Sequence, residues 1–382
     1  MNRTVKRILK ILSLFAAVGA VLLYMQSYIM RPWDFNHIRT KGFYMEPKDS
    51  IDMVLLGQSD IVRAYSPLRA YENTGYTSYV LACDGITAAM WKPLTESAMQ
   101  YQNPDYFIID VNNVCYGEDI DLHRPFDQQM TDDMPYDSHR FSIAMDAKKT
   151  GSDRWLSYLL PIQEYHVGFP ANWADVPDQL HEIRTLEKRG YTYFKGDAQT
   201  YAAEKPGKVL NLKEHMEKQP LSARYEKVLN DYLDFADEHH LNVVFIQTPH
   251  RIPGESSKLF TTFKRSLAAQ EIIEERGYPF LNTELLKDEI GLDMEVDFYN
   301  NGHLNYPGQV KFTDWLWKTI EEQKLLPLKA PDHPEHVKEE WDTCLKYYHA
   351  YAEYLPEFKG KKNTEMCMET TKLIEKLEAR MN

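Results

Sequence analysis

Cysteine is scarce in this sequence, and its cysteines are widely spaced. The 382 residues include four of them, and no two form a C-x-x-C pair: Cys83, Cys115, Cys344 and Cys367. This spacing excludes a zinc ribbon and a thioredoxin-like redox site. It is compatible with a disulfide but does not imply one, because a chain of this length buries enough apolar surface to fold without cross-links.

Basic residues are also in short supply. The chain has 44 Lys and Arg against 57 Asp and Glu, which gives a formal net charge of −13. Nucleic-acid binding needs clustered Lys and Arg to contact phosphates, so we expect no nucleic acid as a partner. The hydrophobic content of 43 % is ordinary for a folded globular protein and argues against disorder.

Long uncharged runs are missing except near the N-terminus, where Ile11 to Met30 is mostly apolar. That run matches the roughly 20 residues that a helix needs to cross a bilayer. Its alanines lie inside the run rather than after it, unlike the exit site of a cleaved signal peptide. Four basic residues precede it: Arg3, Lys6, Arg7 and Lys10. We therefore predict a signal-anchor over residues 1–32, with a cytoplasmic N-terminus and everything after Arg31 outside the cell membrane.

Beyond the anchor, short apolar runs alternate with helical patterns, which is typical of an α/β protein with a mostly parallel sheet covered by helices on both faces. The predicted strands are Met53–Leu56, Ser78–Ala82, Tyr106–Val111, Asn242–Gln247 and Pro279–Leu281. This α/β domain spans about residues 45–325.

Local signals set several helix ends in this domain. Ser66 followed by Pro67 predicts a helix start, and Gly75 predicts its end. Pro93 is expected to kink the next helix.

Two regions do not fit the alternation. Residues 116–220 form a long aromatic-rich insertion, which we interpret as a lid or recognition subdomain because insertions of this length are usually functional. His166 in this insertion is a candidate substrate contact, with a structural role as the alternative. The C-terminal extension, residues 331–382, predicts two amphipathic helices, Glu335–Tyr354 and Thr364–Met381.

The first predicted strand runs directly into Gly57-Gln58-Ser59-Asp60. One interpretation is a tight turn in which Ser59 caps the next segment. The other is that Ser59 is a nucleophile at the carboxyl end of a strand, where α/β folds place their chemistry.

Far downstream, His303 lies in a loop rich in Asn and Gly and precedes a helical pattern. A histidine there serves as general base for Ser59 if that helix folds back against the sheet. The alternative is a loop histidine bonded to backbone.

Further candidates follow the other strands. Gly85 comes after the second strand, and Asn112 and Asn113 end the third. With the Ser59 N–H, the Gly85 N–H and the amide of Asn112 would form an oxyanion hole. Asn113 is almost equally eligible because the strand end is uncertain by a residue. Arg251, after the fourth strand, is a candidate for binding an anionic polymer. Cys83 and Cys115 are expected to be buried free thiols.

These motifs resemble the four blocks of the SGNH (GDSL-like) hydrolase superfamily. Block one corresponds to residues 57–60, block two to Gly85, block three to Asn112 or Asn113, and block five to residues 300–303. The resemblance implies a three-layer, flavodoxin-like fold with a parallel sheet in the order 2-1-3-4-5.

The anchor, the long insertion and the ending "HLNYPGQVKFTDWL" look most like the membrane-anchored DltD and AlgJ-type proteins of cell-envelope acylation. That likeness implies serine esterase or O-acyltransferase chemistry, without a metal or organic cofactor. The substrate would be a cell-surface polysaccharide or teichoic-acid-like polymer, and the partner a membrane-bound O-acyltransferase.

One position departs from the family pattern. The aspartate expected three residues before the histidine is Asn300, and an asparagine fixes a tautomer without neutralising an imidazolium. Asp297, six residues before His303, is a candidate substitute. The alternative function is therefore a non-catalytic SGNH-like scaffold that binds a membrane O-acyltransferase or a glycan.

Overall fold

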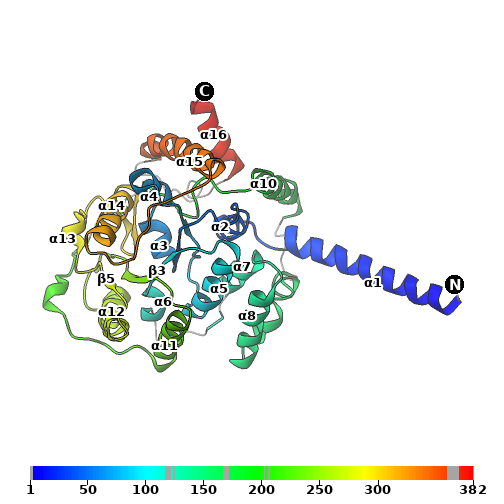
Figure 1. Ribbon diagram of the computed structural model, residues 1–382, viewed down its shortest axis with the longest axis horizontal. Coiled ribbons are helices and arrows are strands. Elements are labelled where there is room, and N and C mark those ends of the chain that lie inside the picture. Colours follow the sequence, from blue (N-terminus) through cyan, green and yellow to red (C-terminus); the bar gives the residue numbers. More distant parts are fainter. Residues whose placement is uncertain are drawn as a thin grey trace.

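The computed structural model describes residues 3–116, 122–123, 125–166, 172–201, 203–204, 207–358 and 370–381. At its centre lies a five-stranded parallel sheet in the order β2-β1-β3-β4-β5 (Figure 1). The strands are β1 (Met53–Leu56), β2 (Ser78–Val80), β3 (Tyr106–Asp110), β4 (Val243–Gln247) and β5 (Phe280–Asn282). The predicted α/β class and strand order are confirmed. The bounds predicted for β1 are confirmed as well, and those of the other four strands were wrong by one or two residues at one or both ends.

All five strands run in the same direction, so their carboxyl ends meet at one edge of the sheet. β1 is central: Met53 pairs with Ser78 of β2 and with Tyr106 of β3. The segments that follow β1, β2, β3, β4 and β5 therefore share this edge, where open α/β sheets bind their ligands.

Helices cover both faces of the sheet. Successive side chains of a strand point to opposite faces, so apolar residues along one strand pack with two different sets of helices. Val54 and Leu56 of β1 pack with α5, α11 and α12, whereas Met53 and Leu55 pack with α3 and α14. The helices around the sheet are α3 (Ser59–Ala64), α4 (Pro67–Thr74), α5 (Trp91–Tyr101), α6 (Asn112–Cys115), α11 (Ala223–Glu238), α12 (Lys258–Glu275), α13 (Lys287–Ile290) and α14 (Tyr306–Glu322). β1 is buried on both faces, as in other parallel sheets.

The predicted helix ends at α4 are confirmed. The Ser66 side chain accepts a hydrogen bond from the Arg69 N–H, and Gly75 takes a left-handed φ of 79°. The kink predicted at Pro93 is wrong, since α5 begins at Trp91 after a short 3-10 turn, η1 (Ala88–Met90). Pro93 thus falls in the first turn, where no N–H is needed.

The described part of the insertion contains helices and 3-10 turns joined by loops. They are α7 (Pro125–Asp132), α8 (Ser138–Lys149), η2 (Asp153–Leu156), α9 (Ile162–Tyr165), η3 (Trp173–Asp175), α10 (Val176–Arg189) and η4 (Leu212–Glu214). At the C-terminus, α15 (Glu335–Tyr354) has the predicted bounds, followed by η5 (Leu355–Phe358) and α16 (Thr371–Met381). The start predicted at Thr364 lies outside the described residues.

The N-terminal helix α1 (Arg3–Tyr28) projects away from the domain, and α2 (Phe35–Phe43) follows it (Figure 1). Among the described residues, α1 alone is long and apolar enough to span a membrane: its most apolar window has a mean hydropathy of 2.2 and none of that window is buried. These properties are consistent with a single-pass anchor.

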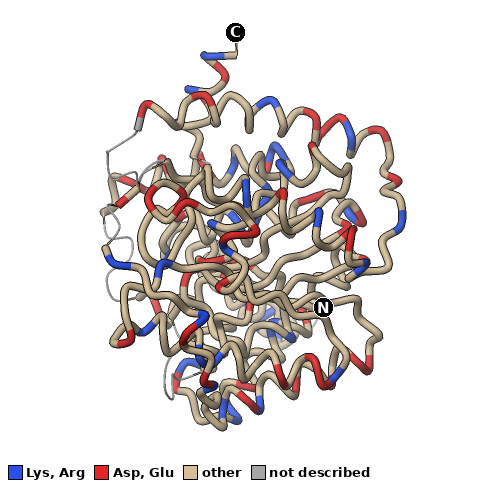
Figure 2. Tube along the Cα trace, turned by 90° about the vertical axis from the view of Figure 1, so that its left-hand side faces the viewer, with Lys and Arg blue, Asp and Glu red and all other residues tan. Residues whose placement is uncertain are grey.

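Charged residues of both signs are mixed, and the thiols are buried, over the described residues. Acidic and basic residues are interspersed along the chain rather than gathered by sign (Figure 2). Cys83 and Cys115 are buried free thiols, which confirms the expectation for both, and Cys344 is buried as well. Cys367 lies outside the described residues.

Candidate active site

Ser59 is presented by a close turn between β1 and α3. β1 ends at Leu56, and Ser59 is the first residue of α3. A Cβ on Gly57 would lie 2.8 Å from both Asp110 Cβ and Ile61 Cγ2. Gly57 is therefore needed because β3 and α3 approach the backbone too closely for a side chain.

His303 comes from a small hairpin that leads into α14. Its strands are β6 (Phe298–Asn300) and β7 (His303–Leu304), in which Asn300 pairs with His303. The Arg251 N–H donates to the Asn301 carbonyl oxygen over 2.8 Å and ties the hairpin to the segment after β4. A Cβ on Gly308 would collide with the Asp297 carbonyl oxygen, so the hairpin and the first turn of α14 fit tightly together.

The two candidate catalytic side chains meet. His303 Nε2 lies 2.8 Å from Ser59 Oγ, and His303 Nδ1 lies 3.0 Å from Asn300 Oδ1. The same Asn300 oxygen accepts the Gly302 N–H over 2.8 Å. The Gly302 N–H can bond only to the oxygen of the Asn300 amide, so it is this oxygen that faces His303 Nδ1. Nδ1 therefore carries the proton and donates to Asn300. Nε2 is then unprotonated and presents its lone pair to the Ser59 hydroxyl.

The environment keeps His303 neutral. Burial lowers its pKa to about 4; Asp60 opposes this shift, while Arg63 and His250 add to it. At neutral pH the ring is therefore unprotonated and able to accept a proton from Ser59.

A second buried network, which sequence reasoning missed, adjoins the first. Asp60 Oδ1 lies 3.1 Å from His250 Nε2, and His250 Nδ1 lies 2.5 Å from Glu284 Oε1. Lys287 pairs with the other Glu284 oxygen at 2.7 Å, and the Tyr116 hydroxyl donates to Asp60 over 3.3 Å.

The neighbouring carboxylates of Glu284 and Asp60 keep His250 protonated. Burial opposes the imidazolium, but Glu284 and Asp60 outweigh it and raise the His250 pKa to about 10. His250 and Glu284 follow β4 and β5 and so share the sheet edge with Ser59. Their positions after β4 and β5 were the sequence signal that could have placed both residues at this edge. The contact between His250 and Glu284 depends on tertiary packing, which the sequence pattern does not give.

Asp297 does not replace Asn300, so the expectation of a substitute carboxylate was wrong. Its Oδ2 pairs with Lys311 Nζ at 2.6 Å and accepts the Asp293 N–H over 2.7 Å. The partner of His303 is Asn300 itself.

The side chains expected in the oxyanion hole are already engaged. Asn112 Nδ2 donates to Thr248 Oγ1 over 2.6 Å and to Asp110 Oδ2 over 3.2 Å. Asn113 Nδ2 donates to the Ile86 carbonyl oxygen over 2.9 Å. The role predicted for these amides was therefore wrong in this structure.

Two backbone positions remain as candidate oxyanion donors. Ser59 opens α3, and the first N–H groups of a helix have no partner within it. Gly85 lies in the loop after β2 with a φ of 68°, which favours glycine, and a Cβ there would lie 2.8 Å from the Phe126 ring.

Arg251 and His166, the two predicted substrate contacts, both bond to backbone carbonyl oxygens. Arg251 is 1 % exposed, and its guanidinium donates to the carbonyl oxygens of Glu204 (3.0 Å) and Met294 (3.2 Å). It therefore supports the hairpin rather than binding a polymer, and that prediction was wrong. His166 is exposed after α9, where its Nδ1 lies 2.7 Å from the Gln163 carbonyl oxygen.

Comparisons with protein-family models and with curated proteins identify no relative of this chain. No protein-family model matches the chain, and no curated protein is significantly similar to it.

Proposed function

We propose that this protein is a membrane-anchored, extracytoplasmic serine esterase or O-acyltransferase of the SGNH type. The observation that carries the proposal is the 2.8 Å contact between Ser59 Oγ and His303 Nε2, with the far side of the ring held by Asn300. A serine and a neutral histidine in this arrangement form an activated nucleophile.

The chemistry follows from the orientation of the ring. Ser59 Oγ attacks the ester carbonyl carbon while its proton passes to His303 Nε2, and the carbonyl oxygen becomes an oxyanion. The N–H groups of Ser59 and Gly85 stabilise that oxyanion. The oxyanion collapses, the alkoxide leaves with the proton from Nε2, and the acyl group stays on Ser59. Water or a polymer hydroxyl then attacks the acyl group, again losing its proton to Nε2. The second oxyanion collapses, the bond between the acyl group and Ser59 Oγ breaks, and Oγ takes the proton back from Nε2.

The transient imidazolium needs a negative charge, and Asn300 carries none. Asp60 is the acidic group that favours the protonated form of His303. Because Asp60 also pairs with the His250 imidazolium, its charge is shared. The site is thus expected to work more slowly than one with a carboxylate directly on Nδ1.

The substrate class follows from the anchor and from the family resemblance. A domain held outside the membrane by α1 would act on an acylated cell-surface polysaccharide or teichoic-acid-like polymer, beside a membrane-bound O-acyltransferase. The absence of a carboxylate on His303 Nδ1 favours a second candidate, a non-catalytic scaffold that binds this acyltransferase or the glycan.

Labelling of the detergent-purified full chain with a fluorophosphonate probe separates the two candidates. The wild type is expected to label covalently, and Ser59→Ala and His303→Ala are expected to lose the label. Ser256→Ala, at an exposed serine, is the matched control and keeps wild-type labelling. A folded wild type that stays unlabelled would establish the scaffold instead.

A further inference from the structure

The exposed aromatic side chains of the domain are concentrated in the insertion. Outside α1, every exposed Phe, Tyr and Trp of the described residues belongs to residues 125–175: Phe126 (37 %), Tyr136 (54 %), Phe141 (54 %) and Trp173 (63 %). Leu160, 41 % exposed, lies in the same segment. This concentration of exposed aromatics in one segment makes the insertion the candidate for an interaction surface.

Two of these residues, Tyr136 and Trp173, belong to segments that contact α1 where it enters the domain. The Gln26 amide of α1 donates to the Tyr136 hydroxyl over 2.8 Å. On the other side, Gln179 of α10 donates to the Tyr28 carbonyl oxygen over 2.8 Å, and η3 with Trp173 leads directly into α10. Figure 1 shows α8 and α10 on either side of the root of α1.

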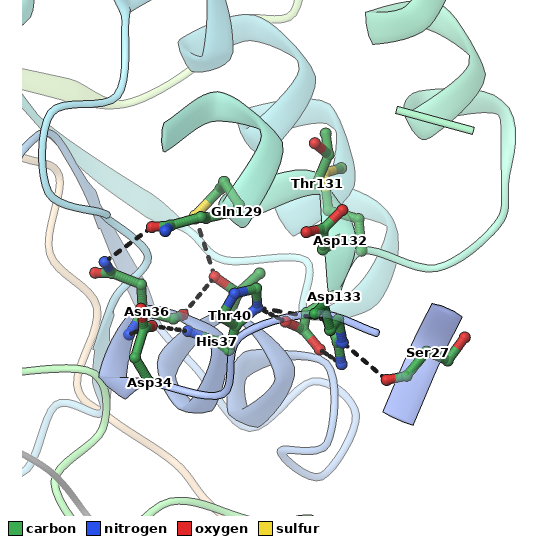
Figure 3. A network of polar contacts seen from close by, with 12 residues as sticks. Ser27, Asp34, Asn36, His37, Thr40, Gln129, Thr131, Asp132 and Asp133 are labelled. Carbon is green, nitrogen blue, oxygen red and sulfur yellow. Dashed lines mark hydrogen bonds and ion pairs between the residues drawn. The ribbon is translucent and has the colours of Figure 1, made fainter. Parts of the chain in front are cut away.

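A buried ionic network holds this junction rigid. Asp133, which follows α7, pairs with Arg31 at 2.6 Å and with His37 Nδ1 of α2 at 2.7 Å (Figure 3). Arg31 Nε donates back to the Ser27 carbonyl oxygen over 2.8 Å. Burial opposes the charge of Asp133, but Arg31 and His37 hold its pKa far below its usual value. The insertion therefore keeps a fixed orientation relative to α1.

We propose that Tyr136, Phe141 and Trp173 insert into the lipid headgroup layer of the bilayer that α1 spans. Tyr and Trp favour the membrane interface because their rings combine an apolar body with a polar group. Tyr136 contacts α1 directly, and the rigid junction brings the insertion and α1 to the same membrane. The insertion then forms a second contact with the membrane besides α1, which we call the membrane rest, and this contact sets the tilt of the domain. This inference depends on the anchor of the proposed function, not on its chemistry.

Tryptophan quenching by lipids tests the proposal on the full chain in phospholipid vesicles. Lipids brominated near the glycerol end of their chains quench tryptophans at the interface. Trp173→Phe is expected to remove a large part of the quenched emission, and adding Phe141→Trp to that variant is expected to restore it. Met216→Trp in the same background is the matched control: position 216 is 47 % exposed but lies outside residues 125–175, and its emission should be unquenched.

The possible failures are distinguishable. If the protein resists alkaline extraction from the vesicles but Trp173→Phe leaves the quenched emission unchanged, the membrane rest is refuted and the anchor stands. If alkali releases the protein, the anchor and the membrane rest both fail. Shielding of Trp173 by a second copy, seen as a disulfide-linked dimer of Phe141→Cys with no lipid quenching, would also overturn the proposal. None of these outcomes depends on Ser59 reactivity.

Discussion

His303 Nε2 lies 2.8 Å from Ser59 Oγ although the two residues are 244 positions apart. The junction between α3 and α4 explains how they meet, because it binds the helix that follows His303. Gln309 of α14 donates to the Tyr65 carbonyl oxygen over 3.1 Å, and the Ser66 N–H donates to Thr313 over 3.0 Å. α14 is thereby fixed on the helix that Ser59 opens.

The reactivity of Ser59 should persist in acid. Because burial lowers the His303 pKa to about 4, the neutral ring predominates well below pH 6. The rate of fluorophosphonate labelling is expected to be flat between neutral pH and about pH 5.5 and to halve near pH 4. Circular dichroism at each pH controls for unfolding. A midpoint near 6.5, the ordinary value for histidine, would contradict this prediction.

Restoring the carboxylate should activate the site. Asn300→Asp places a negative charge on Nδ1, which favours the imidazolium and should raise the midpoint of the pH profile by about 1–3 units. Labelling at pH 8 is expected to be at least about tenfold faster, because the carboxylate stabilises the imidazolium formed during attack. Asn301→Asp, at an exposed neighbour, is the control and should change neither quantity much. An unshifted Asn300→Asp profile would show that Nδ1 does not face residue 300.

Asp60→Asn should destabilise the fold. The change removes one carboxylate from the buried His250 imidazolium, and breaking such a pair typically costs about 3–5 kcal/mol. Urea denaturation measures the loss. The control is Asp231→Asn, which breaks an exposed pair with Lys227 and should cost about 0.5 kcal/mol or less. Equal stabilities of the two variants would show that Asp60 does not stabilise a charged His250.

Stability should fall at alkaline pH through His250. Its pKa is raised to about 10 in the folded protein, against about 6.5 when unfolded, so folding favours the protonated ring. This stabilisation is complete below about pH 6.5 and is lost as the pH rises towards 10. Comparing the free energy of unfolding at pH 7 and pH 9.5 measures it. His250→Gln should be less stable at pH 7 and should show a smaller decline than the wild type.

Gly57→Ala should damage both stability and reactivity. The added methyl group meets Asp110 and Ile61 at 2.8 Å, and such overpacking typically costs about 1–3 kcal/mol. The turn must shift to relieve it, which moves Ser59 and slows labelling. Gly254→Ala is the matched control, since nothing lies within 4 Å of its Cβ. A wild-type melting temperature for Gly57→Ala would show that the turn has room for a methyl group at position 57.

Local sequence signals predicted the elements well. The strands, the Ser66 cap and the bounds of α15 follow from apolar periodicity and turn residues, which depend on neighbours along the chain. Ser59 and His303 were found for a related reason: each lies beside a recognisable element end. Other side chains that follow strand ends were assigned poorly, as Asn112 and Arg251 show, because their partners come from distant segments.

The order of strands and helices, the apolar N-terminal helix and the positions of Ser59 and His303 at element ends were determined by the sequence itself. Tertiary structure decided which polar groups meet: Asp60 with His250 and Glu284, Asp297 with Lys311, and the Asn112 amide with Thr248. The reason is physical. Residue type and spacing determine local conformation, whereas a hydrogen bond between distant segments depends on how the elements carrying its two partners are rotated and packed.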